Sequence, residues 1–144
     1  MELDLKALVL HLFFHFFIAI PFALFLWNKT KSKKQIVVLF LATFLIDTDH
    51  LVDYFAYSGF NLNIVNFLSG EYFVATQKSF TPFHAWEWIL ILGIFTRLRG
   101  WNTLYAVLLL ALIPHIIVDS IATGKPWFYS IIFRFYRGFY FPDY

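Results

Sequence analysis

Long apolar runs alternate with short polar segments along the whole chain. The runs cover residues 7–27, 36–57, 83–98 and 101–122. A helix of about 20 apolar residues is long enough to cross the roughly 30 Å hydrocarbon core of a bilayer. The pattern therefore predicts an all-α integral membrane protein, in which residues 1–144 form a single membrane domain built as a four-transmembrane-helix bundle.

The segments between the runs differ in length and character. Residues 28–34 and 97–100 are short and basic, whereas residues 58–82 are longer and mix glycine, asparagine and serine. Within that longer segment, residues 63–68 have the pattern of a short surface helix. The tail, residues 125–144, is rich in Trp, Tyr and Phe, and Trp and Tyr favour the headgroup level of a membrane. We therefore expect an interfacial aromatic C-terminal segment.

Composition supports the membrane assignment and limits the chemistry. The chain is 60% hydrophobic and 14% charged, whereas a soluble domain is about half apolar and about a quarter charged. There is no cysteine, so a metal site would have to use His, Asp, Glu, carbonyl groups or water. The net charge of +2 is too small to indicate a nucleic-acid partner.

The two tight loops are more basic than the opposite side of the predicted bundle. They contain Lys29, Lys31, Lys33, Lys34, Arg97 and Arg99. Cytoplasmic loops of membrane proteins carry an excess of Lys and Arg. We therefore expect these loops in the cytoplasm, with both termini and the longer segment on the non-cytoplasmic side.

Ionisable residues inside the apolar runs share one depth. Antiparallel threading places ten of them in the half of the bundle near the termini: His11, His15, Asp47, Asp49, His50, Asp53, His84, Glu87, His115 and Asp119. This set includes every histidine of the chain. An ionisable residue in a bilayer costs several kcal/mol unless it has a partner or lines a polar cavity. The shared depth predicts one polar site near one membrane face.

The spacing within single runs places some of these residues on a common helix face. His11 and His15 are four residues apart, as are His115 and Asp119. In the second run, Asp47 would share one helix face with His50, and Asp49 would share a different face with Asp53. Two metal ions, or one ion with carboxylates that orient its histidine ligands, would use both faces.

Other interpretations of the polar residues remain open at this level. A buried hydrogen-bond network that locks the helices together needs no metal. A proton or ion pathway would need polar residues in the other half of the membrane, where Thr43 is one of few. Imidazole and carboxylate ligands without thiolate suit zinc first, with manganese or iron as alternatives. We expect one or two divalent ions.

The order of these motifs resembles the family of membrane-bound metal-dependent hydrolases, the LexA-regulated inner-membrane hydrolases and their small relatives. The similarity rests on an early His11 or His15, the segment Ile46–His50, the segment Phe83–Ala85 and the spacing His115–Asp119. It extends through Asp119 and leaves the tail outside. The resemblance implies a metal-dependent hydrolase in a bacterial inner (plasma) membrane.

A metal near the headgroups would act most directly on a lipid or lipid-linked phosphoester or ester, because a bound divalent ion activates water at neutral pH. The candidate metal ligands are His11, His15, Asp47, Asp49, His50, His84, His115 and Asp119. Asp53 and Glu87 are candidate general bases, or orienters of the histidines. Arg134 and Arg137 are candidates for holding a phosphate or for anchoring the tail at the interface.

Two further expectations concern class and partners. The competing class is a non-catalytic metal-binding membrane scaffold or accessory protein. An open coordination position favours an enzyme, whereas a closed shell favours a structural role. The expected partner is a membrane lipid or lipid-linked substrate, and a homo-oligomer is left open.

Overall fold

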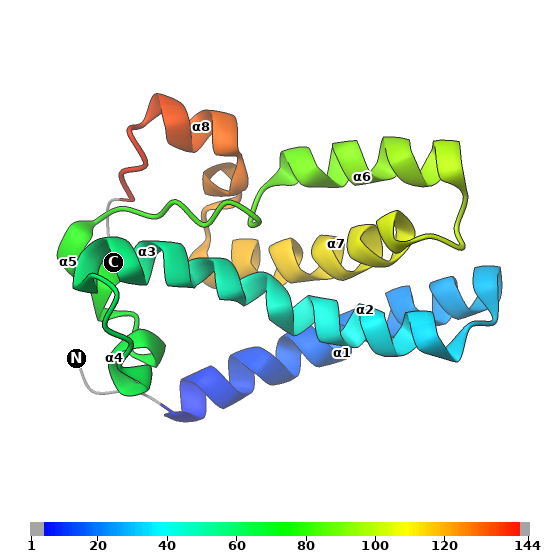
Figure 1. The fold of residues 1–144 in the computed structure, drawn as a ribbon, viewed down its shortest axis with the longest axis horizontal. Coiled ribbons are helices and arrows are strands. Elements are labelled where there is room, and N and C mark those ends of the chain that lie inside the picture. Colours follow the sequence, from blue (N-terminus) through cyan, green and yellow to red (C-terminus); the bar gives the residue numbers. More distant parts are fainter. Residues whose placement is uncertain (1–4, 142–144) are drawn as a thin grey trace.

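The computed structural model describes residues 5–141 as a helical protein (Figure 1). Its elements are α1 (Leu5–Thr30), α2 (Lys33–Leu45), η1 (Ile46–Asp49), α3 (His50–Ser58), α4 (Ile64–Leu68), α5 (Glu71–Thr76), α6 (Trp86–Arg99), α7 (Leu104–Thr123), η2 (Pro126–Tyr129) and α8 (Ile131–Tyr136). In the described part of the chain the only extended pairing is an isolated antiparallel bridge between Lys78 and Tyr140. The all-α prediction is confirmed.

Helices long and apolar enough to cross a membrane occupy Lys6–Thr30, Lys33–Ser58 and Leu104–Thr123, among residues 5–141. The third predicted run, residues 83–98, forms a shorter helix. Its first residues lie in a turn that follows Pro82 and Ala85 is extended, so α6 begins at Trp86 and has 14 residues, which rise about 21 Å at 1.5 Å per residue. Three candidate spans, rather than the four expected, are therefore present among the described residues, which is consistent with a membrane protein.

Local signals in the sequence account for several helix ends. Ser32 and Thr103 accept hydrogen bonds from backbone N–H groups of the first turns of α2 and α7. α7 ends where Gly124 adopts a left-handed φ of 64°, which favours glycine. The predicted short helix at residues 63–68 is present as α4, which begins after an Asn63 cap.

α7 is the centre of the bundle and packs against α1, α2 and α6. Small residues form much of the contact: Ala19 and Ala23 on α1 and Ala106 and Ala111 on α7 are buried in one apolar cluster. Small side chains let membrane helices approach closely. In contrast, large residues such as Phe17 of α1 are more than half exposed, as expected for a surface that lipid covers.

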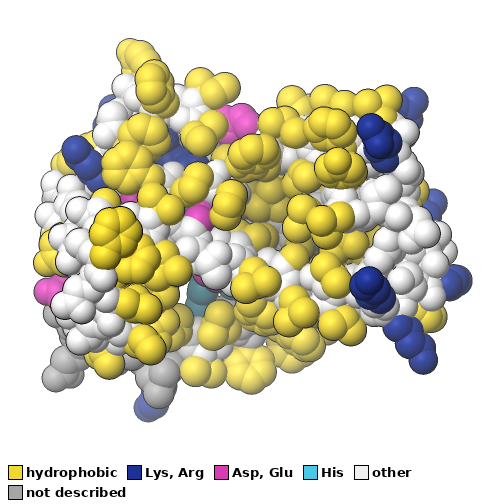
Figure 2. Space-filling view, in the orientation of Figure 1, with side chains coloured by type: hydrophobic (Ala, Val, Ile, Leu, Met, Phe, Trp, Pro, Cys, Tyr) yellow, Lys and Arg dark blue, Asp and Glu magenta, His cyan; other side chains and the backbone are white. Residues whose placement is uncertain are grey.

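The two ends of the bundle differ in structure. The tight α1–α2 and α6–α7 turns lie together at one end, and the short helices and both termini lie at the other (Figure 1). Figure 2 shows Lys and Arg side chains gathered over the tight turns, while acidic and histidine side chains show through near the opposite end. The histidine and acidic side chains therefore lie at the end that contains the short helices.

Candidate metal centre

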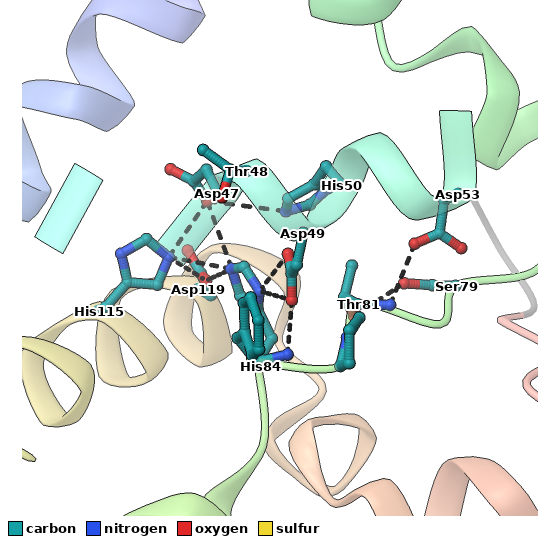
Figure 3. Close-up of polar contacts among 12 residues, drawn as sticks. Asp47, Thr48, Asp49, His50, Asp53, Ser79, Thr81, His84, His115 and Asp119 are labelled. Carbon is teal, nitrogen blue, oxygen red and sulfur yellow. Dashed lines mark hydrogen bonds and ion pairs between the residues drawn. The ribbon is translucent and has the colours of Figure 1, made fainter. Parts of the chain in front are cut away.

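Four separate parts of the chain bring the histidines and aspartates together, and Figure 3 labels the residues from all of these parts except α1. α1 supplies His11 and His15, the η1–α3 junction supplies three residues, the segment before α6 supplies His84, and α7 supplies His115 and Asp119. These elements meet at the end of the bundle opposite the basic turns. The predicted convergence at one depth is what the structure contains.

The second span changes from α-helix to a tight 3₁₀ turn where its acidic residues begin. η1 separates α2 from α3 and contains Asp47 and Asp49. Short 3₁₀ stretches within long helices often accompany functional sites. The turn directs Asp47 and Asp49 to different nitrogens of the His84 ring, Nε2 and Nδ1 respectively.

Donor atoms of Asp47, His84 and His115 form one group, and Asp119 Oδ2 lies beside the two histidines of this group. His84 Nε2 lies 3.0 Å from His115 Nε2, 3.3 Å from Asp47 Oδ1 and 3.4 Å from Asp119 Oδ2. His115 Nε2 lies 3.2 Å from Asp47 Oδ1 and 3.3 Å from Asp119 Oδ2. Ligands about 2.0–2.2 Å from a tetrahedral zinc ion are separated by roughly 3.3–3.6 Å. The distances among Asp47, His84 and His115 are close to this range, and Asp119 Oδ2 lies within 3.4 Å of both histidine nitrogens.

Hydrogen bonds alone do not account for all of these close contacts, whereas a bound cation does. One N–H group points in one direction, yet each of the Nε2 atoms of His84 and His115 has three polar neighbours within 3.4 Å. A metal ion at their common point would contact every donor at once. The donor chemistry and the spacing therefore both fit a divalent metal.

A second group of donors lies on the other side of Asp119. His11 Nε2 and His15 Nε2 are 2.8 Å apart. They lie 3.3 Å and 3.1 Å, respectively, from Asp119 Oδ1. His15 is fully buried, whereas the His11 side chain is 36% exposed. The two oxygens of Asp119 thus face different pairs of histidines.

Asp49 contacts the Nδ1 atom of His84 rather than the Nε2 side of the ring, where the other donor atoms gather. Its carboxylate lies 3.0 Å from His84 Nδ1 and accepts a 2.6 Å hydrogen bond from the backbone N–H of Phe83. A carboxylate on the far nitrogen of a metal-binding histidine fixes the ring and its tautomer. His50, whose Nε2 is 3.6 Å from Asp47 Oδ1, lies at the edge of the group and also forms a possible donor set with Asp49 and His84.

Asp53 holds the backbone of the segment that carries His84. Its two carboxylate oxygens accept hydrogen bonds from Phe80 N at 2.6 Å and Thr81 N at 3.0 Å. Both oxygens are therefore engaged with the loop. Of the two roles considered for Asp53, these contacts favour positioning over proton transfer.

Glu87 is engaged with the tail. Its carboxylate accepts hydrogen bonds from Ser130 Oγ and from the backbone N–H groups of Ile131 and Ile132. These groups form the N-terminus of α8, where a negative charge is favourable. The contacts make Glu87 an anchor for α8.

Arg134 is the residue whose role the sequence least revealed. Its guanidinium is fully buried and donates hydrogen bonds to the carbonyl groups of Phe80, Thr81 and His84 and to the Thr81 hydroxyl. Burial lowers the pKa of Arg134, and the negative charges of Asp49 and Asp53 oppose that shift. These contacts hold the segment that carries His84 in place, and they leave the Arg134 guanidinium buried rather than placed to hold a phosphate. Arg137, in contrast, is exposed.

The tail completes the wall of a polar pocket of about 170 Å³. Its lining consists of His11, Asp47, His50, Ser79, Thr81, His84, Asp119, Ala122, Thr123, Phe128, Tyr129 and Phe141. The last three residues belong to the tail, and the Phe141 N–H donates to the Gln77 carbonyl at 2.7 Å. The tail therefore belongs to the site; residues 142–144 of the predicted interfacial segment lie outside the described residues.

Sequence reasoning missed the contribution of Arg134. A basic residue three positions before the exposed Arg137, within an otherwise aromatic helix, was the available signal. It did not distinguish a buried guanidinium from an interfacial one, because the partners of Arg134 are backbone carbonyl groups that have no signature in sequence.

In comparisons with known proteins, no family model, curated sequence or solved structure matches the chain.

Proposed function

We propose that this chain is a metal-dependent membrane hydrolase that cleaves a phosphoester or ester of a lipid or lipid-linked substrate. The observation that carries the proposal is the convergence of donor atoms from Asp47, His84, His115 and Asp119 beside a polar pocket. A divalent ion supplies Lewis-acid chemistry and an activated water in such a site. Zinc is the first choice on ligand type, with manganese or iron as alternatives.

The surroundings of the site support a lipid as the substrate. An apolar groove of about 530 Å³ runs between α2, α6 and α7. Ile46 and Phe83 line it, and each directly precedes a donor residue, Asp47 or His84. An acyl chain in the groove would therefore place the polar end of its lipid near the metal donors.

The residues of the chain divide into ligands and supports in this proposal. Asp49 orients His84, while Asp53 and Arg134 fix the backbone on which His84 is carried. His50 borders the pocket without a second close carboxylate contact of its own, so it is the side chain best placed to hold the substrate or move a proton.

The membrane setting completes the proposal. α6 acts as a short fourth crossing beside α7, and the basic turns face the cytoplasm, so the site opens to the non-cytoplasmic side. The resemblance to membrane-bound metal-dependent hydrolases agrees with this arrangement and suggests a bacterial inner membrane.

One observation favours a second function. Four protein donors can fill a tetrahedral shell completely, which is typical of structural metal sites. A non-catalytic metal-binding scaffold or accessory protein would use the same residues without an open position. A hydrolase would change the composition of the membrane lipids, whereas a scaffold would leave it unchanged.

The test compares lipids from membranes that contain wild-type protein or Asp47→Asn at matched levels. We expect wild type to deplete a lipid class and release its headgroup, phosphate or fatty acid, and Asp47→Asn to abolish this effect. Glu71→Gln removes an exposed carboxylate on α5 and serves as the matched control. Identical lipid profiles for wild type and Asp47→Asn, with metal present only in wild type, would replace the hydrolase with the scaffold.

A further inference from the structure

The carboxylate of Asp119 lies between two groups of histidines and contacts both. Oδ1 is 3.3 Å from His11 Nε2 and 3.1 Å from His15 Nε2. Oδ2 is 3.4 Å from His84 Nε2 and 3.3 Å from His115 Nε2. One carboxylate that presents a separate oxygen to each of two imidazole pairs has the arrangement of a ligand that bridges two metal ions.

We propose that the chain binds two divalent ions bridged by Asp119, and that the position formed by His11, His15 and Asp119 is the open one, where a substrate oxygen binds. This inference rests on the proposed function, since it assigns the substrate to one part of the same centre. It identifies the substrate group as a phosphate or carboxylate oxygen.

The two positions differ in the number of protein donors. Asp47, His84, His115 and Asp119 Oδ2 offer four, the number that a closed tetrahedral zinc site uses. The position at His11 and His15 has three, the number that catalytic zinc sites typically use while a water or substrate takes the fourth place. The closed position would stabilise the arrangement and the open position would bind the substrate.

The histidines of the two positions differ in burial. His115 is fully buried and His84 nearly so, and the exposed member of that position is Asp47, whose side chain is 34% exposed. His11 is partly exposed and lines the polar pocket together with Asp119. An incoming oxygen would therefore reach the His11 position directly from the pocket.

His15 argues for an ion at this second position. It is a fully buried imidazole in a membrane-spanning helix, and its Nε2 lies within 3.1 Å of both His11 Nε2 and Asp119 Oδ1. Its ring also stacks on His115, with centroids 4.1 Å apart, so the two histidine pairs form one continuous centre. A shared cation accounts for His11, His15 and Asp119 converging where lipid offers no solvation.

The first measurement is the metal content of purified full-length protein loaded with zinc and dialysed. We expect two ions per wild-type chain, one in His11→Ala, one in His115→Ala, and loss of more than one in Asp119→Ala. Glu71→Gln should keep two. One ion per chain in both wild type and His11→Ala would overturn the second position while leaving the metal-dependent function standing. A wild-type protein without metal would remove both.

The second measurement tests which position is open and does not depend on activity. In cobalt-substituted wild-type protein, inorganic phosphate should change the visible absorption of the metal, because an anion enters an open coordination place. The cobalt that remains in His11→Ala should not respond to phosphate. A wild-type spectrum that phosphate leaves unchanged, or an equal response in His11→Ala, would overturn the assignment of the open position.

Discussion

The two halves of the bundle use the same long helices but are held together differently. Near the tight turns, α1, α2 and α7 meet through a cluster of small and aliphatic residues that includes Ala19, Leu39 and Ala106. Near the termini, the continuations of the same helices meet through histidine and aspartate, such as His15 and Asp119.

The apolar half depends on shape, and the polar half depends on directed contacts. Close packing tolerates no extra volume, whereas a set of donors must each find a partner. We therefore expect changes in the apolar half to alter stability alone and changes in the polar half to alter metal retention. Four predictions test this division, from the largest expected effect to the smallest.

The largest effect should follow from Arg134→Met. The change leaves the carbonyl groups of Phe80, Thr81 and His84 without their buried donor. Each buried hydrogen-bond acceptor left unsatisfied costs about 1–3 kcal/mol, so the loss at several carbonyl groups should lower the melting temperature strongly and release the metal. Arg137→Met, at an exposed position, is the control and should change neither. Full metal content in Arg134→Met would show that the segment that carries His84 holds its position without the guanidinium.

Metal removal should have the next largest effect and should leave the apolar half intact. An ion present at 100 to 1,000 times its dissociation constant stabilises the folded state by about 2.7–4.1 kcal/mol. Chelation should lower the melting temperature without reducing helical circular dichroism at room temperature. Asp47→Asn should show a smaller further decrease with chelator, because only the position at His11, His15 and Asp119 would then hold an ion. A loss of helical signal on chelation would mean that the polar half also maintains the bundle.

Ala19→Leu should affect the apolar half alone. Ala19 is fully buried at the contact with α7, and overpacking typically costs about 1–3 kcal/mol. We expect a lower melting temperature and unchanged metal content in the protein that remains folded. Ala56→Leu, which places the same side chain at an exposed position of α3, is the control. Metal loss in Ala19→Leu would show that the halves are coupled through the helices.

Glu87→Gln should have the smallest effect. The change removes the charge that accepts hydrogen bonds at the start of α8, and such capping contacts contribute about 1 kcal/mol. Faster amide exchange or proteolysis in residues 131–136 is expected, with metal content unchanged. If metal is lost instead, Glu87 acts on the centre more directly than its described contacts indicate.

Several features were predictable because they depend on local pattern. Apolar run length indicated the helices, and the short helix expected at residues 63–68 is present as α4. The shared depth of the histidines indicated their convergence. The third run was overestimated, because Phe83 and Ala85 count as apolar although Phe83 lies in a turn and Ala85 is extended.

By itself, the sequence determined a membrane-embedded helical protein with a histidine and aspartate site at one end, since an apolar run has few alternatives to a helix and a buried charge needs a partner. Only the tertiary structure decided how the carboxylates divide their roles. Asp47 and Asp119 face the imidazoles, Asp49 orients His84, and Glu87 anchors the tail. These roles depend on distances between residues far apart in the chain, which helix periodicity leaves undefined.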